Sequence, residues 1–173
     1  MKQEKCTKCK KKSVWVDYTH KNYCEQHFIE QIEKRIRKHL RINKIIDVKK
    51  TYYLQPDKEN KHLLTKFFLE NIFQSRLKVS NKKNENTLVS DTLDDEAEQL
   101  MYYFLKNQEM PKGIKPINVI TDAEAQIISE IIKIPLKIKP KLQEELTKKD
   151  PQLLFSLHKS KQFIEQRIKD LEK

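Results

Sequence analysis

Glycine and cysteine are scarce in this chain of 173 residues, which has one glycine and three cysteines. Because phosphate-binding loops need glycines to bring the backbone close to an anion, the shortage argues against a glycine-rich nucleotide loop. An odd number of cysteines does not suit a disulfide framework, and no apolar signal segment precedes them. The sequence has no apolar run long enough to span a bilayer, so we expect a cytoplasmic protein without a membrane partner.

Apolar side chains are also few, because 37% of the residues are hydrophobic and 35% are charged. A chain of this length holds one ordinary domain, or a small module and a reduced domain. So little apolar material predicts a modest core, and we expect a bound metal ion to contribute to stability.

The positive charge is concentrated at the beginning of the chain. Of the net charge of +11, residues 1–50 carry +9 and all later residues carry +2. A basic surface of this kind, next to a small metal-binding module, predicts a polyanionic partner, most often a nucleic acid.

All three cysteines fall within the first 24 residues, and a histidine follows the last of them at the same spacing. Two donors separated by two residues turn inward on one tight knuckle, and two knuckles supply the tetrahedral donor set that zinc prefers. Four protein donors fill the coordination shell of the zinc ion and leave no position open for a substrate. The sequence therefore predicts a structural zinc ion with the ligands Cys6, Cys9, Cys24 and His27. His20 is a less favoured alternative to His27, because it breaks the paired spacing.

The pattern after the first cysteine pair predicts a hairpin that begins at residues 13–19 and a helix from Cys24 to Asn43. One face of this helix is apolar at every fourth position, with Phe28, Ile32, Ile36 and Leu40. The other face carries the predicted nucleic-acid-binding residues Lys34, Arg35, Arg37, Lys38 and Arg41. The alternative is a solvated face without a ligand. We expect residues 1–45 to form a zinc finger plus a basic amphipathic helix.

Later segments alternate between predicted strands and helices. We expect strands at residues 50–55 and 87–90, helices at residues 63–73 and from 91 to about 107, and a loop over residues 75–86. Thr121 and Glu124 have the spacing of a capping box, which predicts a helix that ends near Ile134 and Pro135. A final helical region is predicted to begin at Asp150 and Pro151.

The first 38 residues closely resemble the N-terminal zinc finger of the tRNA 2-thiouridine-forming enzymes of the cytosolic type, which are PP-loop ATP pyrophosphatases. The resemblance rests on C-x-x-C, an aromatic hairpin, the run Tyr-Cys-Glu-Gln-His-Phe-Ile-Glu at residues 23–30, and a basic helix. Residues 91–99, Asp-Thr-Leu-Asp-Asp-Glu-Ala-Glu-Gln, resemble the family segment Gly-His-Asn-Leu-Asp-Asp-Glu-Ala-Gln. The resemblance implies an α/β fold in which a reduced Rossmann-like PP-loop domain, of the adenine nucleotide alpha-hydrolase type, occupies residues 46–173.

The family's phosphate loop, Ser-Gly-Gly-Lys-Asp-Ser, corresponds here to Gln-Pro-Asp-Lys-Glu-Asn at residues 55–60. Without glycine, and with Asp57 and Glu59 to repel a triphosphate, ATP binding in the family manner is not expected. The matched positions form a degenerate nucleotide site of Asp57, Lys58, Asp94 and Asp95. Asp94 and Asp95 also have a purely structural explanation, because negative side chains stabilise the first turn of a helix. Residues 136–140 lack the family's cluster-binding cysteine, so no iron–sulfur cluster is expected.

These residues favour a non-catalytic tRNA-thiolation-type protein, which binds tRNA or partners a full-length, active tRNA-thiolation homologue. One alternative is a minimal ATP-dependent tRNA 2-thiouridine synthetase that uses an altered loop around Lys58. Another is an adaptor whose zinc module binds protein, with the basic helix against an acidic partner.

Overall fold

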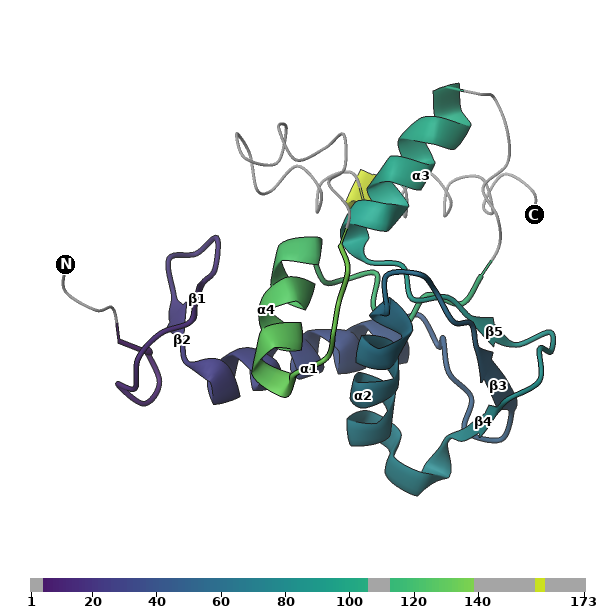
Figure 1. Ribbon diagram of the computed structural model, residues 1–173, viewed down its shortest axis with the longest axis horizontal. Helices are drawn as coiled ribbons and strands as arrows, with labels where there is room; N and C mark the ends of the chain where they lie inside the picture. The colour runs from purple at the N-terminus through teal and green to yellow at the C-terminus, as the bar shows by residue number, and fades with distance from the viewer. Residues whose placement is uncertain (1–4, 106–112, 139–157, 161–173) are drawn as a thin grey trace.

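The chain begins with a small hairpin that leads directly into a long helix (Figure 1). This structure is a computed structural model, and it describes residues 5–105, 113–138 and 158–160. Strand β1 (Trp15–Val16) pairs antiparallel with β2 (Asn22–Tyr23), and helix α1 spans Glu25–Ile42. The predicted hairpin and basic helix are confirmed, although β1 is shorter than the alternating stretch suggested.

A small parallel sheet follows the long helix. Its central strand β3 (Thr51–Leu54) lies between β4 (Lys78–Ser80) and β5 (Thr87–Leu88), both parallel to it. The loop predicted over residues 75–86 is therefore wrong, because it contains β4. This strand is three residues long and largely exposed, so its sequence has no hydrophobic alternation that would predict it. Its hydrogen-bonded pairing with β3 identifies it as a strand.

Helices connect and follow the strands, as parallel pairing requires. Helix α2 (Lys61–Phe73) and the short helix η1 (Gln74–Arg76) lead from β3 to β4, and α3 (Leu93–Leu105) follows β5. Helix α4 (Asp122–Ile132) begins with the predicted capping box, in which Thr121 accepts the N–H of Glu124. Residues 158–160 are helical, and the rest of the helix predicted from residue 150 lies outside the described residues.

The core forms where α1 lies against α2 and α4 (Figure 1). The apolar face of α1 is buried as predicted, and its residues share one cluster with others from α2, β3 and α4, among them Leu64, Phe68, Tyr52 and Ile128. Side chains from both sides of residue 45 thus pack together, and the division into domains at 1–45 and 46–173 stays a prediction. None of the helices in the described ranges has both the length and the apolar character needed to cross a membrane.

Candidate functional site

Three thiols and one imidazole meet beside the hairpin. The ligand atoms of Cys6, Cys9, Cys24 and His27 all lie within 4.8 Å of one another. The Nδ1 atom of His27 lies 3.4 Å from the sulfur of Cys6 and 3.4 Å from that of Cys24. His20 is exposed at the hairpin turn and is not a member of this group, which is therefore a Cys3His set that could hold a metal ion.

Two local structures bring these donors together. Cys24 is the N-cap residue of α1 and His27 lies in the first turn, so their spacing of three places both side chains on one side of the helix end. The first cysteine pair lies on a tight turn, in which the N–H of Lys10 donates to the carbonyl of Cys6 at 3.0 Å. The predicted two-knuckle arrangement is thus the one that the chain adopts.

The pKa values of Cys6 and Cys9 are shifted in opposite directions. Burial alone would raise the pKa of Cys6, but backbone N–H groups, among them that of Lys8, lower it to about 6. A backbone N–H of Lys11 lowers the pKa of Cys9, yet burial and the sulfur of Cys24 outweigh it and the pKa is raised. Cys6 therefore loses its proton more readily than Cys9, and a thiolate is the form that binds metal.

The basic residues of α1 do not share one surface. Arg35 points to α4, where its Nη2 atom lies 2.6 Å from the carboxylate of Glu124. Arg37 binds Glu33 of its own helix and the carbonyl oxygens of Asn71 and Ile72 at the end of α2. Arg35 is thus occupied in holding two helices together and lies apart from the other predicted RNA-binding cations.

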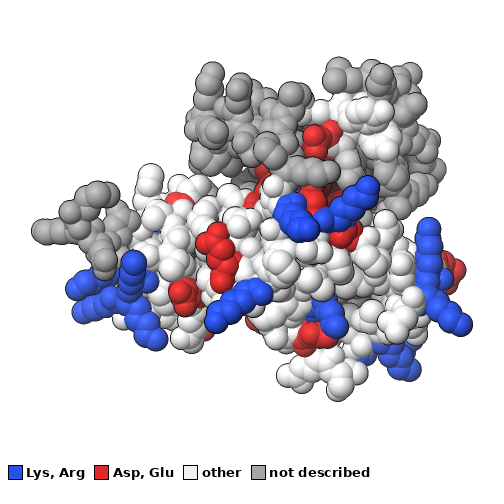
Figure 2. All heavy atoms as spheres, viewed as in Figure 1, with Lys and Arg blue, Asp and Glu red and all other residues white. Residues whose placement is uncertain are grey.

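The remaining predicted cations line a groove of about 540 Å³ between α1, residues 43–50 and the end of α2. Lys34, Arg37, Lys38 and Arg41 are joined there by Arg76 of η1. Sequence reasoning missed Arg76, since nothing in its local pattern indicates that it reaches α1. The view in Figure 2 shows Lys and Arg side chains gathered around the finger and more sparsely elsewhere on that face.

A second hollow of about 250 Å³ lies where β3 and β5 end, and Asp57, Lys58 and Asp95 of the predicted degenerate nucleotide site line it. Asp94 is not among its lining residues, because its carboxylate accepts the N–H of Asp122 at the start of α4 at 2.7 Å. Three of the four matched positions therefore meet at one hollow, and the fourth has a structural partner.

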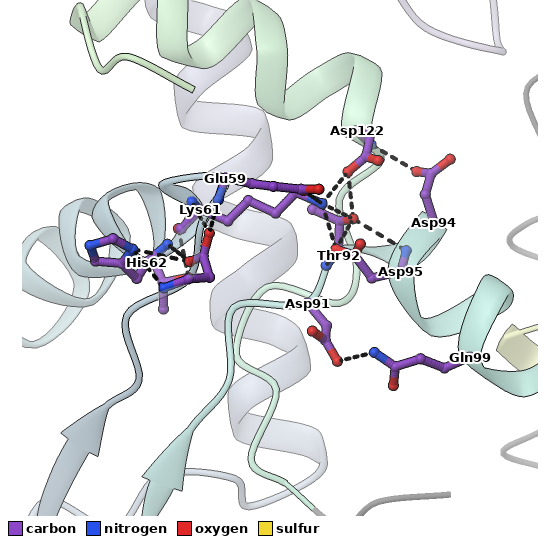
Figure 3. A network of polar contacts seen from close by, with 11 residues as sticks. Glu59, Lys61, His62, Asp91, Thr92, Asp94, Asp95, Gln99 and Asp122 are labelled. Carbon is purple, nitrogen blue, oxygen red and sulfur yellow. Dashed lines mark hydrogen bonds and ion pairs between the residues drawn. The ribbon is translucent and has the colours of Figure 1, made fainter. Parts of the chain in front are cut away.

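The ammonium of Lys61 lies beside this hollow, surrounded by carboxylates (Figure 3). Its Nζ atom is 2.6 Å from Asp95, 3.0 Å from Asp122 and 3.0 Å from Glu59, and its side chain is 4% exposed. Burial by itself would lower the pKa of Lys61, but Asp95 and Asp122 outweigh it, and the pKa is raised above its ordinary value. The amine is therefore a permanent cation inside an acidic cluster.

Sequence reasoning missed Lys61 as a site residue. The residue stands at the first position of α2, where a lysine reads as a solvated side chain. Glu59 lies two residues before Lys61, but Asp95 and Asp122 come from α3 and α4, so no local spacing could have indicated them.

The N-terminus of α2 is capped by Asp57. One carboxylate oxygen accepts the N–H groups of Glu59 and Lys61 at 2.9 and 3.0 Å, and the other accepts the N–H of His62 at 2.7 Å. The free N–H groups of a helix N-terminus are the usual binding site for a phosphate. Here a side chain of the same protein occupies them.

The solved structures contain a close match in fold, whereas no protein-family model and no curated protein matches the sequence. This match shows that the chain shares its fold with a tRNA thiolase. The particular structure is the U34-tRNA thiolase NcsA from Methanococcus maripaludis with its [4Fe-4S] cluster. The alignment has a TM-score of 0.73 and 15% identity, and it covers 95% of this chain and 88% of that one.

At this identity the likeness establishes the fold alone. The predicted fold class is confirmed, with a parallel sheet in an α/β arrangement and a Cys3His group near the N-terminus. The Cys3His group is a candidate metal site of this chain, and the neighbouring structure contains a [4Fe-4S] cluster.

Proposed function

We propose that this chain is a non-catalytic tRNA-thiolation-type protein of the cytoplasm, which binds tRNA and pairs with an active tRNA 2-thiolation enzyme. The observation that carries the proposal is the carboxylate of Asp57 at the N-terminus of α2. A triphosphate bound there would have to displace an anion that already accepts three backbone N–H groups, and then replace those bonds.

The charge of the hollow supports the same conclusion. Its lining contains the carboxylates of Asp57, Glu59, Asp91 and Asp95 and the amines of Lys58 and Lys61. A further amine, that of Lys115, pairs with Asp91, so the carboxylates still outnumber the amines by one. The amine of Lys61 is already bound by three carboxylates, so it offers little attraction to a phosphate. An excess of negative charge in a partly enclosed site repels ATP.

For the Cys3His group we propose a structural zinc ion and no iron–sulfur cluster. Four donors around one zinc ion lie about 3.8 Å apart, given zinc–sulfur bonds of about 2.3 Å. The closest donor pairs lie 3.4 to 3.5 Å apart and all four ligand atoms lie within 4.8 Å of one another, which fits one shared ion. The sequence has three cysteines in all, so none remains for a second metal centre.

We place the tRNA on the cations of α1 that line the groove. Lys34, Lys38 and Arg41 are exposed and make no ion pair with any other described residue. Lysine and arginine held on a rigid helix bind phosphates and release their counterions, which makes the affinity strongly salt-dependent.

The edge of the sheet supports a protein partner. Strand β4 is paired on one side with β3, and among the described residues nothing pairs with its other side. Val79 in this strand is 52% exposed. An uncovered edge that carries an apolar side chain is a surface that another protein covers, and a full-length thiolation homologue is the partner we propose.

Two binding measurements on the purified chain test the proposal. We expect tRNA to bind with an affinity that falls steeply with salt, and calorimetry to detect no binding of ATP with magnesium. Lys34→Glu combined with Lys38→Glu should weaken tRNA binding about 100-fold. The matched reversal of Lys82 and Lys83, which are exposed and lie outside the groove, should cost much less.

The two alternatives give different results. ATP binding that Lys58→Ala abolishes would favour a minimal thiouridine synthetase, since Lys58 lines the hollow. A protein partner that stays bound after nuclease treatment, with no affinity of the chain for tRNA, would favour the adaptor. Co-purification of a thiolation homologue together with tRNA supports the proposal made here.

A further inference from the structure

The groove beside α1 combines positive charge with an apolar floor. A surface that contacts only a phosphate backbone needs the positive charge but not the apolar floor. Its cations come from α1 and η1, and its floor includes Ile46, Val48 and Phe73. Val48 is 42% exposed, while the side chains of Ile46 and Phe73 are half-buried. The volume of about 540 Å³ falls within the range of about 300 to 1,000 Å³ typical of sites for small ligands.

The groove is held open by specific contacts. Arg37 bridges α1 to the last carbonyl groups of α2 through Asn71 and Ile72. On the opposite side, the N–H of Asp47 donates to the hydroxyl of Tyr52 at 2.8 Å, which fixes the segment between Ile46 and Val48. The walls are therefore ordered before any ligand arrives, which reduces the entropic cost of binding.

The charge selects an anionic ligand. The acidic residue closest in sequence to the groove cations of α1 is Glu33, and it is bound to Arg37. The ends of Lys34, Lys38 and Arg41 form no ion pair within the described part of the chain. A ligand that satisfies these groups and also covers the apolar floor has phosphates and a flat apolar face.

We infer that this groove binds an unpaired nucleotide of RNA, with its base against Ile46, Val48 and Phe73 and its flanking phosphates on Lys38 and Arg41. The inference rests on the proposed tRNA binding and specifies how that surface binds. A paired base keeps its faces inside the duplex stack and could not reach the floor, so the groove distinguishes loops from stems. A peptide fits less well, because stable protein interfaces bury about 800 Å² on each side and the exposed apolar floor is small.

Fluorescence anisotropy with three RNAs tests the inference on the full chain. The probes are a short single-stranded RNA, the same strand annealed into a duplex, and a tRNA transcript. We expect the single strand to bind about tenfold more tightly than the duplex. Val48→Ser should weaken binding of the single strand about fivefold and leave the duplex unchanged, because it removes apolar contact and no charge.

The matched control for Val48→Ser is Val79→Ser, since Val79 is also an exposed valine but lies on β4, outside the groove. It should change none of the affinities. Lys38→Ala with Arg41→Ala should weaken all three RNAs about tenfold or more.

The outcomes separate this inference from the proposed function. Equal affinity for single strand and duplex, with no effect of Val48→Ser, would overturn the inference while leaving tRNA binding intact. Absence of binding to all three RNAs would overturn both. A poly-glutamate peptide that binds more tightly than RNA, and that loses affinity in the Val48→Ser variant, would assign the groove to an acidic protein and overturn the inference.

Discussion

The carboxylate of Asp57 accepts the backbone N–H of His62 at 2.7 Å, across the first turn of α2. Its other oxygen accepts the N–H of Lys61 in the same turn and the N–H of Glu59, two residues before the helix. Asp57 follows the end of β3 and lines the hollow of about 250 Å³ there. One aspartate therefore both stabilises the helix and accepts N–H groups that would otherwise be free at its start.

Replacement of Asp57 by alanine should lower the free energy of unfolding by about 1 kcal/mol, the usual cost of removing a helix cap. Asp57→Asn should lose less, because an amide oxygen still accepts an N–H. Urea denaturation measures both. Inorganic phosphate should raise the melting temperature of Asp57→Ala more than that of the unaltered protein, since the donors are then free. Equal effects of phosphate on the two proteins would contradict a filled anion site.

Lys61 should be far more important for stability than its neighbour Lys58. Lys61→Met leaves three carboxylates without their cation in a buried cluster, and we expect a loss of about 3 to 5 kcal/mol. Lys58→Met, at a residue that lines the same hollow, should change stability by less than about 0.5 kcal/mol. Thermal and urea unfolding of the pair give the comparison, and similar losses would refute the role of the ammonium as the centre of the cluster.

Stability should fall as the solution becomes mildly acidic, in part because of His39. Its imidazole is buried, accepts a hydrogen bond from the amide of Asn43 and donates to the carbonyl of Lys115. Burial lowers the pKa of His39 below its ordinary value, and nearby His158 adds to this shift.

The direction of the pH effect follows from the lowered pKa. The unfolded chain takes up a proton at His39 near pH 6.5, while the folded chain resists it to lower pH. The stabilisation is thus complete above about pH 6.5 and is lost as the pH falls through the folded value. Urea unfolding between pH 7.5 and 5 should show a smaller loss for His39→Gln than for the unaltered protein, and parallel profiles would contradict the assignment.

Arg35 should support stability and not RNA affinity. Its ion pair with Glu124 joins α1 to the capping box of α4, and the Glu124 side chain is 8% exposed. Arg35→Ala should cost about 1 to 3 kcal/mol, because it leaves a largely buried carboxylate unpaired. Binding of tRNA should change far less than in the Lys34 and Lys38 double variant. A double-mutant cycle with Glu124→Gln measures the coupling, and a value near zero would count against this contact.

Removal of metal should unfold the finger. We expect mass spectrometry to find one zinc ion per chain, and the purified protein to lack the visible absorption of an iron–sulfur cluster. A strong chelator, or Cys9→Ser, should lower the melting temperature and increase proteolysis around the hairpin. Iron with inorganic sulfide in the purified protein, or a chelated chain that stays as stable as before, would contradict a structural zinc ion.

Short-range patterns in the sequence predicted a large part of this protein. The spacing of Cys6, Cys9, Cys24 and His27 predicted one cluster of donors. Apolar residues at every fourth position predicted the buried face of α1, and the capping-box spacing of Thr121 and Glu124 predicted the start of α4. Each of these depends on residues that are close in the chain, or on one repeated spacing, so the backbone geometry of a knuckle or a helix is enough to bring them together.

The tertiary structure decided which polar groups face one another. The cations of α1 share a local pattern, yet packing against α4 directs Arg35 to Glu124 and packing against α2 brings Arg76 to the groove. The pairing of β4 with β3 defines that strand. Packing also brings Asp95 of α3 and Asp122 of α4 to the buried amine of Lys61. Such contacts depend on how distant segments pack. Hydrophobic periodicity predicts which face of an element is buried, but it does not predict which charged side chains the packing brings together.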